Sequence, residues 1–230
     1  MEMKKGFTSP PYSCNALMAA AIIVSLLVLM SSNMKTCSAA PATATTTSSI
    51  NTDCNCKTNF IRSGCASTTY PKLCYTSLSP YASYVGTNRT RLAIVALKVS
   101  LSATRNSSAL VKKVSRRHDL MANETAAIKD CVETVGDAKD ELKQSLQEMN
   151  NLSGSDFEYT ISSIEAWVSA ALTDDATCTD GLNGFNGKVE KRILKSVTLA
   201  AELTSNALAI IESITSIYSS NSKGTVTSSP

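Results

Sequence analysis

The sequence is poor in the residues that most catalytic sites and β-sheet proteins need. Only 5% of its 230 residues are aromatic, with nine glycines and six prolines, which disfavours a β-sandwich rich in aromatic and turn residues. It contains one histidine, His118, so Ser-His-Asp or Cys-His catalysis would depend on a single residue in a predicted connection. It lacks the G-x-S-x-G and H-E-x-x-H motifs, and the glycine-rich run 181–187 lacks phosphate-loop spacing. An enzyme is therefore disfavoured, and we predict no catalytic residues, no cofactor and no metal.

The sequence also lacks a large excess of positive or negative charge. The chain has 22 Lys and Arg against 19 Asp and Glu, for a net charge of +3. Both signs are interspersed, so neither nucleic acid nor an anionic membrane is expected as a partner. The pairs at 112–113 and 116–117 are basic residues near a predicted helix end, where they interact favourably with the helix dipole.

The first 40 residues have the pattern of a secretory signal peptide. Lys4 and Lys5 precede an apolar core from Ala19 to Met30, and Ala39 or Ala40 offers a cleavage site with small residues. A membrane anchor is the alternative, but this core is shorter than the roughly 20 residues needed to span a bilayer. We therefore expect signal cleavage and secretion, with no membrane association afterwards.

Four segments with helical periodicity follow a Thr/Ser/Ala-rich flexible lead-in at 41–57. They are Asn88–Arg117, Asn123–Met149, Asp156–Leu172 and Asn186–Tyr218, and each has one apolar stripe and one polar face. The first stripe consists of Leu92, Ala96, Val99, Ala103, Leu110 and Val114. The second consists of Ile128, Cys131, Val135, Ala138, Leu142, Leu146 and Met149. The third consists of Ile161, Ile164, Val168 and Ala171. The fourth consists of Val189, Ile193, Val197, Ala200, Leu203, Ala207, Ile211, Ile214 and Tyr218.

Short connections near 118–122, 150–155 and 175–185 favour antiparallel neighbours. They predict an all-α fold, an up-down-up-down four-helix bundle over 88–218. Asn123 is a candidate N-cap of the second helix, and Ser155 or Asp156 of the third. Residues 221–230 are expected to form a tail.

A helical hairpin at 59–84 is predicted before the bundle. Pro71 suits the first turn of a new helix and cannot continue an earlier one. We therefore expect one helix from Asn59 to about Ser67, a tight turn, and a second helix from Pro71. Such a hairpin buries too little apolar surface to be stable alone, so a disulfide across its turn would have a clear physical purpose.

The chain contains eight cysteines, which in a secreted protein indicate disulfides first. Cys14 and Cys37 would leave with the signal peptide. The other six, which allow 15 pairings, are Cys54, Cys56, Cys65, Cys74, Cys131 and Cys178. A zinc site formed by the first four of them is the minor alternative, because secretion oxidises such thiols.

Four N-x-[ST] sequons indicate a glycoprotein if the chain is secreted. They begin at Asn88, Asn106, Asn123 and Asn151. Acidic side chains on the second long helix, including Glu133 and Glu141, could in principle be paired carboxylates for hydrolysis. A solvated helix face is the simpler interpretation.

The hairpin also carries a family resemblance. The string NFIRSGCASTTYPKLCYTSLSPYA, residues 59–82, resembles the N-terminal hairpin of the plant invertase/pectin methylesterase inhibitor family. The resemblance continues through AAIKDCVETVGDAKDELKQSL from Ala126, WVSAALTDDATCTDG from Trp167 and LTSNALAIIESI from Leu203. It implies an inhibitor domain over 58–220.

The same resemblance implies two disulfides, Cys65–Cys74 in the hairpin and Cys131–Cys178 between the second and third bundle helices. Cys54 and Cys56 depart from this four-cysteine pattern. The stretch from Trp167 is similar to inhibitor-like regions attached to some pectin methylesterases. Because the chain stops at Pro230, we expect a free-standing inhibitor.

Pectin methylesterase is the expected target, in a 1:1 complex in the apoplast or cell wall. Invertase inhibitors of this fold carry Pro-Lys-Phe before the third bundle helix, and nothing similar occurs between Asn150 and Glu165. Invertase inhibition is the alternative, and a non-inhibitory apoplastic binding role the second. By analogy the contact surface lies on the exposed side of the second bundle helix, and the candidate contacts are Glu133, Asp137, Asp140 and Gln144.

Overall fold

The computed structural model describes residues 49–152 and 156–224, and every regular element within those ranges is helical. The predicted signal peptide, the start of the lead-in, Ser155 and the last residues of the tail lie outside the described residues. In chain order the elements are α2 (Ser49–Cys65), α3 (Pro71–Leu78), the 3-10 helix η2 (Ser79–Tyr81), α4 (Ala82–Val85), α5 (Arg89–Val114), α6 (Ala122–Asn150), α7 (Phe157–Gly181) and α8 (Lys188–Gly224).

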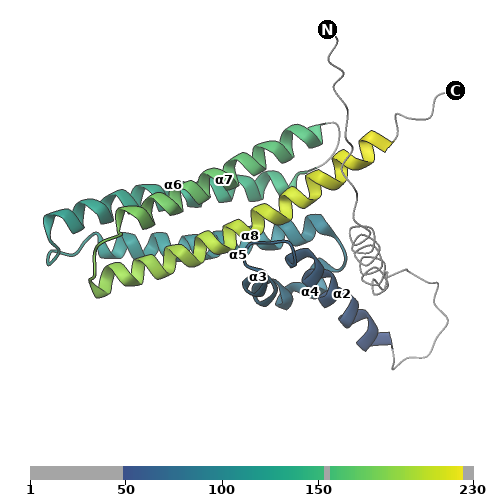
Figure 1. The fold of residues 1–230 in the computed structure, drawn as a ribbon, viewed down its shortest axis with the longest axis horizontal. Coiled ribbons are helices and arrows are strands. Elements are labelled where there is room, and N and C mark those ends of the chain that lie inside the picture. Colours follow the sequence, from purple (N-terminus) through teal and green to yellow (C-terminus); the bar gives the residue numbers. More distant parts are fainter. Residues whose placement is uncertain (1–48, 153–155, 225–230) are drawn as a thin grey trace, which may run out of the picture. The chain divides into compact units, whose positions relative to one another are not determined.

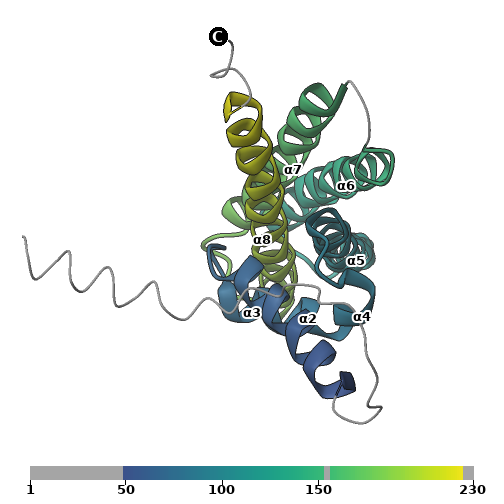
Figure 2. The same ribbon diagram turned by 90° about the vertical axis from the view of Figure 1, so that its right-hand side faces the viewer.

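The four longest helices, α5 to α8, form an antiparallel bundle, which confirms the predicted all-α class (Figure 1). Each packs against its two neighbours in a closed ring: α5 with α6, α6 with α7, α7 with α8, and α8 with α5. The view along the bundle shows these helices around a common interior (Figure 2). The α5–α8 edge is therefore on the opposite side of the bundle from the α6–α7 edge.

The N-terminal hairpin packs against one part of the bundle through α5 and α8. Pro71 stands at the first position of α3, as predicted. The first hairpin helix, however, begins at Ser49 and not at Asn59, so part of the predicted flexible lead-in is helical. The segment contains neither proline nor glycine before Gly64, and extending an existing helix costs far less than nucleating one.

The start of α6 differs from the prediction. Asn123 is not the N-cap but lies in the first turn, where its side chain accepts a hydrogen bond from the Glu124 N–H at 3.0 Å. Met121 occupies the cap position, and its backbone N–H donates to Glu124 Oε2 at 2.9 Å. A glutamate at the third helical position thus satisfies the cap backbone, as in half of a capping box.

The last two helices are longer than predicted. α7 continues past Leu172 to Gly181, so much of the predicted connection at 175–185 is helix. Asp156 occupies its N-cap position, as one of the two predicted candidates. α8 continues past Tyr218 to Gly224. By length and composition alone α8 could cross a membrane, but its apolar stripe packs inside the bundle.

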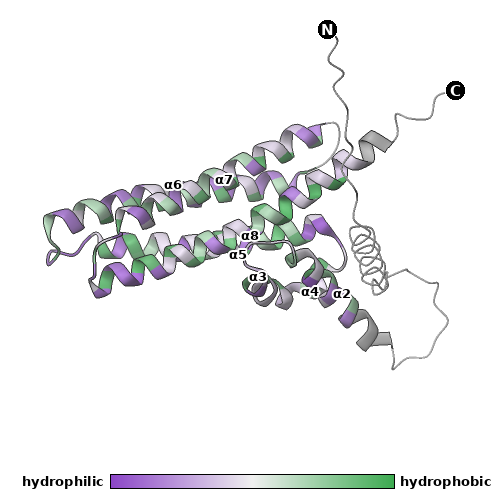
Figure 3. Ribbon diagram, viewed as in Figure 1, coloured by the Kyte–Doolittle hydropathy of each residue, from purple (hydrophilic) through white to green (hydrophobic). Residues whose placement is uncertain are grey.

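The interior contains two apolar clusters separated by a polar layer. One cluster joins the hairpin to the part of the bundle around Leu97, Leu142 and Ile164. The other surrounds the Cys131–Cys178 pair. Between the clusters lie buried polar residues of α5, α7 and α8, which we call the polar layer: Thr104, Ser107, Ser108, Asp175 and Thr204. The alternation of apolar and polar faces along the helices is visible in Figure 3.

The predicted stripe of α7 is fully buried, whereas the stripes of α5, α6 and α8 each include residues that are only half-buried or exposed. In α5, Ala103 and Leu110 are only half-buried, whereas Thr104 and Ser107 are fully buried. The stripe was misplaced because hydroxyl side chains occupy the core positions of the polar layer. In α8, Tyr218 is 42% exposed.

Candidate partner-binding face

The four residues predicted to contact a partner form one exposed stripe along α6. Glu133, Asp137, Asp140 and Gln144 follow one another at intervals of three or four residues, which places them on the same side of a helix. All four are exposed. The Asp140 carboxylate lies 3.2 Å from Lys139 Nζ, which offsets part of its charge. Asp137 borders α7.

At that border three carboxylates come together, and we call them the acidic cluster: Asp137, Glu141 and Asp174. Burial raises the pKa of Glu141 to about 7, and the charges of Asp174 and Asp137 contribute in the same direction. Burial and the charge of Asp137 also raise the pKa of Asp174. A hydrogen bond between Glu141 and Asp174 favours the proton on Glu141, which opposes the rise for Asp174. The cluster therefore gains negative charge as the pH rises toward neutrality.

The acidic cluster does not have the arrangement of a carboxylate pair for hydrolysis. Glycoside hydrolysis needs two carboxylates on either side of a substrate-binding cleft, whereas this cluster lies along the junction of two packed helices. Within residues 49–152 and 156–224, no group of three or more His, Cys, Asp or Glu side chains has a geometry suited to a metal ion. His118 is exposed in the connection between α5 and α6.

A disulfide joins the two helices that present this face. Cys131 in α6 and Cys178 in α7 are bonded, with their Cα atoms 4.6 Å apart. Both side chains are buried, in the apolar cluster on one side of the polar layer. The bond limits sliding of α6 against α7, so the exposed stripe and the acidic cluster keep a fixed relative position.

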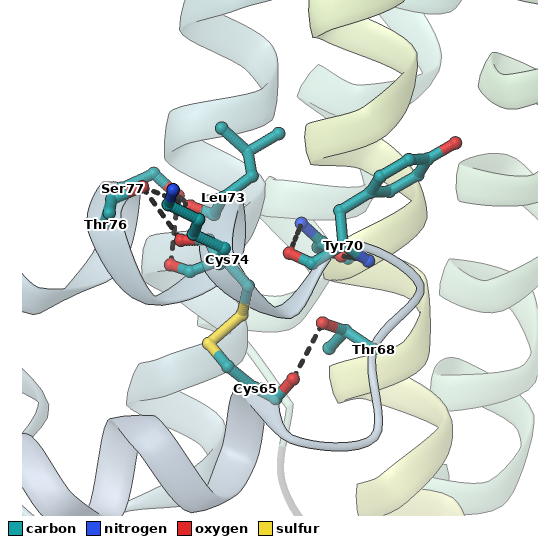
Figure 4. Close-up of a disulfide and its surroundings, with 9 residues drawn as sticks. Cys65, Thr68, Tyr70, Leu73, Cys74, Thr76 and Ser77 are labelled. Carbon is teal, nitrogen blue, oxygen red and sulfur yellow. Dashed lines mark hydrogen bonds between the residues drawn. A yellow bond between two sulfur atoms is a disulfide. The ribbon is translucent and has the colours of Figure 1, made fainter.

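The hairpin turn is fixed by a second disulfide and by α8. Cys65 and Cys74 are bonded, with Cα atoms 5.6 Å apart, and the Thr68 hydroxyl donates to the Cys65 carbonyl at 2.9 Å (Figure 4). Tyr70 N–H donates to Asn206 Oδ1 at 3.0 Å, and Asn206 Nδ2 donates to the Tyr70 carbonyl at 3.1 Å. One buried amide therefore satisfies both backbone groups of the residue before Pro71.

Both pairings are the ones that the resemblance implies. Because Cys65 and Cys74 are bonded to each other, the alternative zinc site is wrong. Cys56 is also disulfide-bonded, which the four-cysteine pattern did not anticipate.

All four predicted glycosylation sites are exposed in the structure. Asn88 is also the N-cap of α5, where its Oδ1 accepts from the Arg91 N–H at 2.9 Å. Asn106 lies within α5, Asn123 in the first turn of α6, and Asn151 at the C-cap of α6. Their exposure is compatible with glycans, and their occupancy stays a prediction.

Sequence reasoning missed three residues that matter here. Asp174 lies beyond the predicted end of the third helix at Leu172, although no proline or glycine interrupts α7 before Gly181. Asp175 fell in the predicted connection at 175–185, but it lies within α7 and is fully buried. Asn206 stands among the apolar residues of LTSNALAII, and a polar residue in such a stripe could have indicated a specific buried hydrogen bond.

Comparison with known proteins agrees with this architecture. The family model described as plant invertase/pectin methylesterase inhibitor matches residues 59–210. The chain belongs to this family. It is 43% identical over 157 residues to the "21 kDa protein" of Daucus carota, covering 66% of this chain and 81% of that protein. It is 41% identical to pectinesterase inhibitor 10 of Arabidopsis thaliana, covering 66% of this chain but only 50% of that protein.

Pectinesterase inhibitor 9 of Arabidopsis thaliana is 39% identical over 160 residues, 78% of its length. A crystal structure of a mutant pectin methylesterase inhibitor from Arabidopsis matches with a TM-score of 0.55 at 18% identity, covering 64% of this chain and 92% of that one, which supports the fold.

Proteins of this family are inhibitors without enzymatic activity, which confirms the prediction that this chain is not an enzyme. Proteins of this family inhibit pectin methylesterases or invertases and are typically extracellular.

Proposed function

We propose that this protein is a secreted inhibitor of pectin methylesterase. It binds one esterase molecule reversibly over the substrate cleft and so limits the removal of methyl esters from pectin in the cell wall. The observation that carries this choice of target is the similarity to two proteins named pectinesterase inhibitors, at 41% and 39% identity. The absence of Pro-Lys-Phe between Asn150 and Glu165 argues in the same direction.

Inhibition of this kind requires no covalent reaction by the inhibitor, only reversible binding. A face that keeps its shape before binding loses less conformational freedom on association, so more of the contact energy appears as affinity. The α6–α7 face has this property, because the Cys131–Cys178 bond and the packed interior lie directly behind it. Glu133, Asp137 and Gln144 present polar and charged groups from a rigid helix.

The acidic cluster makes the charge of this face depend on pH. As the pH falls below about 7, Glu141 takes up a proton and the face becomes less negative. A positively charged esterase surface would then be bound less tightly, and a negatively charged one more tightly. The affinity therefore changes with pH in a direction that reports the charge of the partner.

A two-enzyme titration tests the proposal. Purified protein is added to a plant pectin methylesterase and, separately, to an acid invertase, with ester hydrolysis and sucrose cleavage as readouts. We expect esterase activity to disappear near an equimolar ratio and invertase to be unaffected. Inhibition of invertase alone would favour the alternative target, and no response from several isoforms of either enzyme would favour a non-inhibitory binding role.

Matched variants test the face. Asp137→Ala and Asp140→Ala are expected to weaken esterase inhibition, whereas Glu212→Ala, an exposed acid on α8, should not. Far-UV circular dichroism should be the same for all three variants. Equal inhibition by all of them would place the contact surface elsewhere.

Secretion is tested by N-terminal sequencing of protein collected outside the cell. We expect the mature chain to begin near Pro41. An intact N-terminus would contradict signal cleavage.

A further inference from the structure

A groove with a basic rim runs between α5 and α8. These two helices lie side by side (Figure 1), on the edge of the bundle opposite the proposed inhibitory face. It consists of two adjoining cavities of about 320 and 360 Å³, which share Leu110 and Arg192. Its floor is aliphatic, and Leu199 at one end is 44% exposed. The floor is formed by Leu110, Val114, Val189 and Leu199.

Five cations line this groove and no acid does. They are Lys113, Arg117, Lys188, Arg192 and Lys195. From Lys188 to Leu199 the groove follows α8 for about 16 Å, at 1.5 Å per residue, so the cations form a row rather than a point-like site.

Two carboxylates act on Arg117, at one end of this row. Asp119 accepts hydrogen bonds from the Arg117 guanidinium and raises its pKa, and the charge of Glu190 contributes in the same direction. Glu190 is buried at the start of α8. Within the described ranges, Lys113, Lys188, Arg192 and Lys195 form no salt bridge. Four of the five charges are therefore available to an anion.

We propose that this groove binds a linear polyuronate, the carboxylate-bearing polymer that remains when methyl esters are hydrolysed from pectin. This inference rests on the proposed function, since it takes the product of the target enzyme as the ligand. A row of cations matches a polymer that repeats its carboxylates along one chain. The aliphatic floor suits the C–H faces of sugar rings.

The same features fit a protein partner less well. Protein–protein interfaces concentrate their binding energy in Trp, Tyr and Arg side chains within well-packed pockets. The groove floor has four aliphatic side chains and no aromatic one. An acidic protein is therefore an outcome of the test below and not the proposal.

The position of the groove has a consequence for function. Because it lies on the edge opposite α6 and α7, the polymer and the esterase can bind at the same time. The inhibitor would then accumulate where ester hydrolysis has already exposed carboxylates. Binding through surface charges is screened by salt, with a Debye length of about 8 Å at physiological ionic strength, so this anchoring should weaken as salt increases.

The test measures binding of the full secreted protein to immobilised polygalacturonate and to fully methyl-esterified pectin. N-glycans are removed first, because the Asn106 sequon lies at the groove. The protein should bind polygalacturonate at least about tenfold more tightly than the ester. Arg192→Gln/Lys195→Gln should weaken that binding about tenfold, since two surface ion contacts of roughly 0.7 kcal/mol each correspond to one decade.

Lys129→Gln/Lys143→Gln is the matched control. It removes the same charge from exposed positions on α6 and should change the affinity by less than about twofold. An equal loss of affinity in both double variants would show that net charge alone determines the binding, and would overturn the assignment to the groove. Failure to bind polygalacturonate, equal binding of the methyl ester, or tighter binding of poly-glutamate would each overturn the polyuronate assignment.

Esterase inhibition, measured in solution with the same variants, keeps this inference separate from the proposed function. The groove variant should inhibit the enzyme as well as the unsubstituted protein does. If the unsubstituted protein does not inhibit, the proposed function fails, and polymer binding still decides whether the groove is a polyuronate site.

Discussion

Replacement of Asp175 by asparagine should stabilise the protein at neutral pH and remove much of the pH dependence of its stability. Asp175 lies in the polar layer of the bundle interior and is 0% exposed. Neither carboxylate oxygen has a hydrogen-bond partner within the described part of the chain. Burial raises the pKa of Asp175 from 3.8 to about 7, and the charge of Asp174 contributes to the rise.

The sign of the effect follows from proton linkage. Between about pH 4 and about pH 7 the folded protein keeps the Asp175 proton while the unfolded chain has lost it. The folded state therefore binds more protons, and the free energy of unfolding falls as the pH rises through this window. Below it both states are protonated, and above it both are ionised, so the loss is complete near pH 7.

The magnitude follows from the same shift. About three pKa units at 1.36 kcal/mol each correspond to roughly 4 kcal/mol, which is an upper value because water and local relaxation reduce the cost of a buried charge. Asp175→Asn has nearly the same shape and no charge. At about pH 8 it should be about 2–4 kcal/mol more stable than the unsubstituted protein, and Tm should rise by about 5–15 °C.

Urea unfolding followed by far-UV circular dichroism, at several pH values from about 4 to about 8, measures this directly. Near pH 4 the two proteins should be about equally stable. The control is Asp130→Asn on the exposed face of α6, which should leave the pH dependence in place. An Asp175→Asn protein that is less stable at pH 8, or that keeps the full pH dependence, would show that the carboxylate has a compensating partner and would refute the reasoning.

Three further predictions concern the hairpin, the disulfide and the acidic cluster. Asn206→Ala should lower the free energy of unfolding by about 2 kcal/mol, because the hydrogen bonds to both Tyr70 backbone groups are lost; unchanged urea unfolding would contradict this. Replacement of both Cys131 and Cys178 by alanine opens a 47-residue separation and should cost about 4 kcal/mol by the chain-entropy model, measured as a lower Tm with the Cys65–Cys74 bond intact. Glu141→Gln should reduce the difference in esterase inhibition between about pH 5 and about pH 8, and an unchanged difference would assign that pH dependence to other groups.

Most of the fold could be predicted from the sequence because its dominant signal is hydrophobic periodicity. In α7, the four predicted core residues Ile161, Ile164, Val168 and Ala171 are all buried. In α6 the predicted stripe also matches, apart from Leu146, which is half-buried. Burial of an apolar stripe is the main stabilising contribution to such a helix, so the pattern and the structure share one cause.

Helix ends were less predictable, because they depend on backbone chemistry that hydropathy does not record. Glu124 caps α6 by accepting the Met121 N–H, although Asn123 has the more common capping side chain. The helix α2 extends to Ser49 through polar residues that offer no periodicity. The relevant signal there was the lack of proline and glycine, which permits extension without requiring it.

The candidate site was predictable only in part. The spacing of Glu133, Asp137, Asp140 and Gln144 suffices to place them on one side of α6. That Asp174 lies beside Asp137 depends on how far α7 extends and how it packs against α6. Periodicity within each segment does not determine how two helices align along their axes.

The most informative failures are polar residues at core positions. Asp175 follows Ala171 by one helical turn and precedes Cys178 by another, so it continues the apolar stripe of α7 in geometry but interrupts it in hydropathy. That interruption is why the helix was predicted to end at Leu172.

Asn206 interrupts the stripe of α8 in the same way, but it holds the hairpin turn through two hydrogen bonds. A polar residue in a core is retained where it specifies a contact or serves function, and otherwise lowers stability. Asn206 belongs to the first class. Asp175 has no such bond in the described structure, so its cost in stability should appear as the pH rises, and the Asp175→Asn unfolding experiment measures that cost.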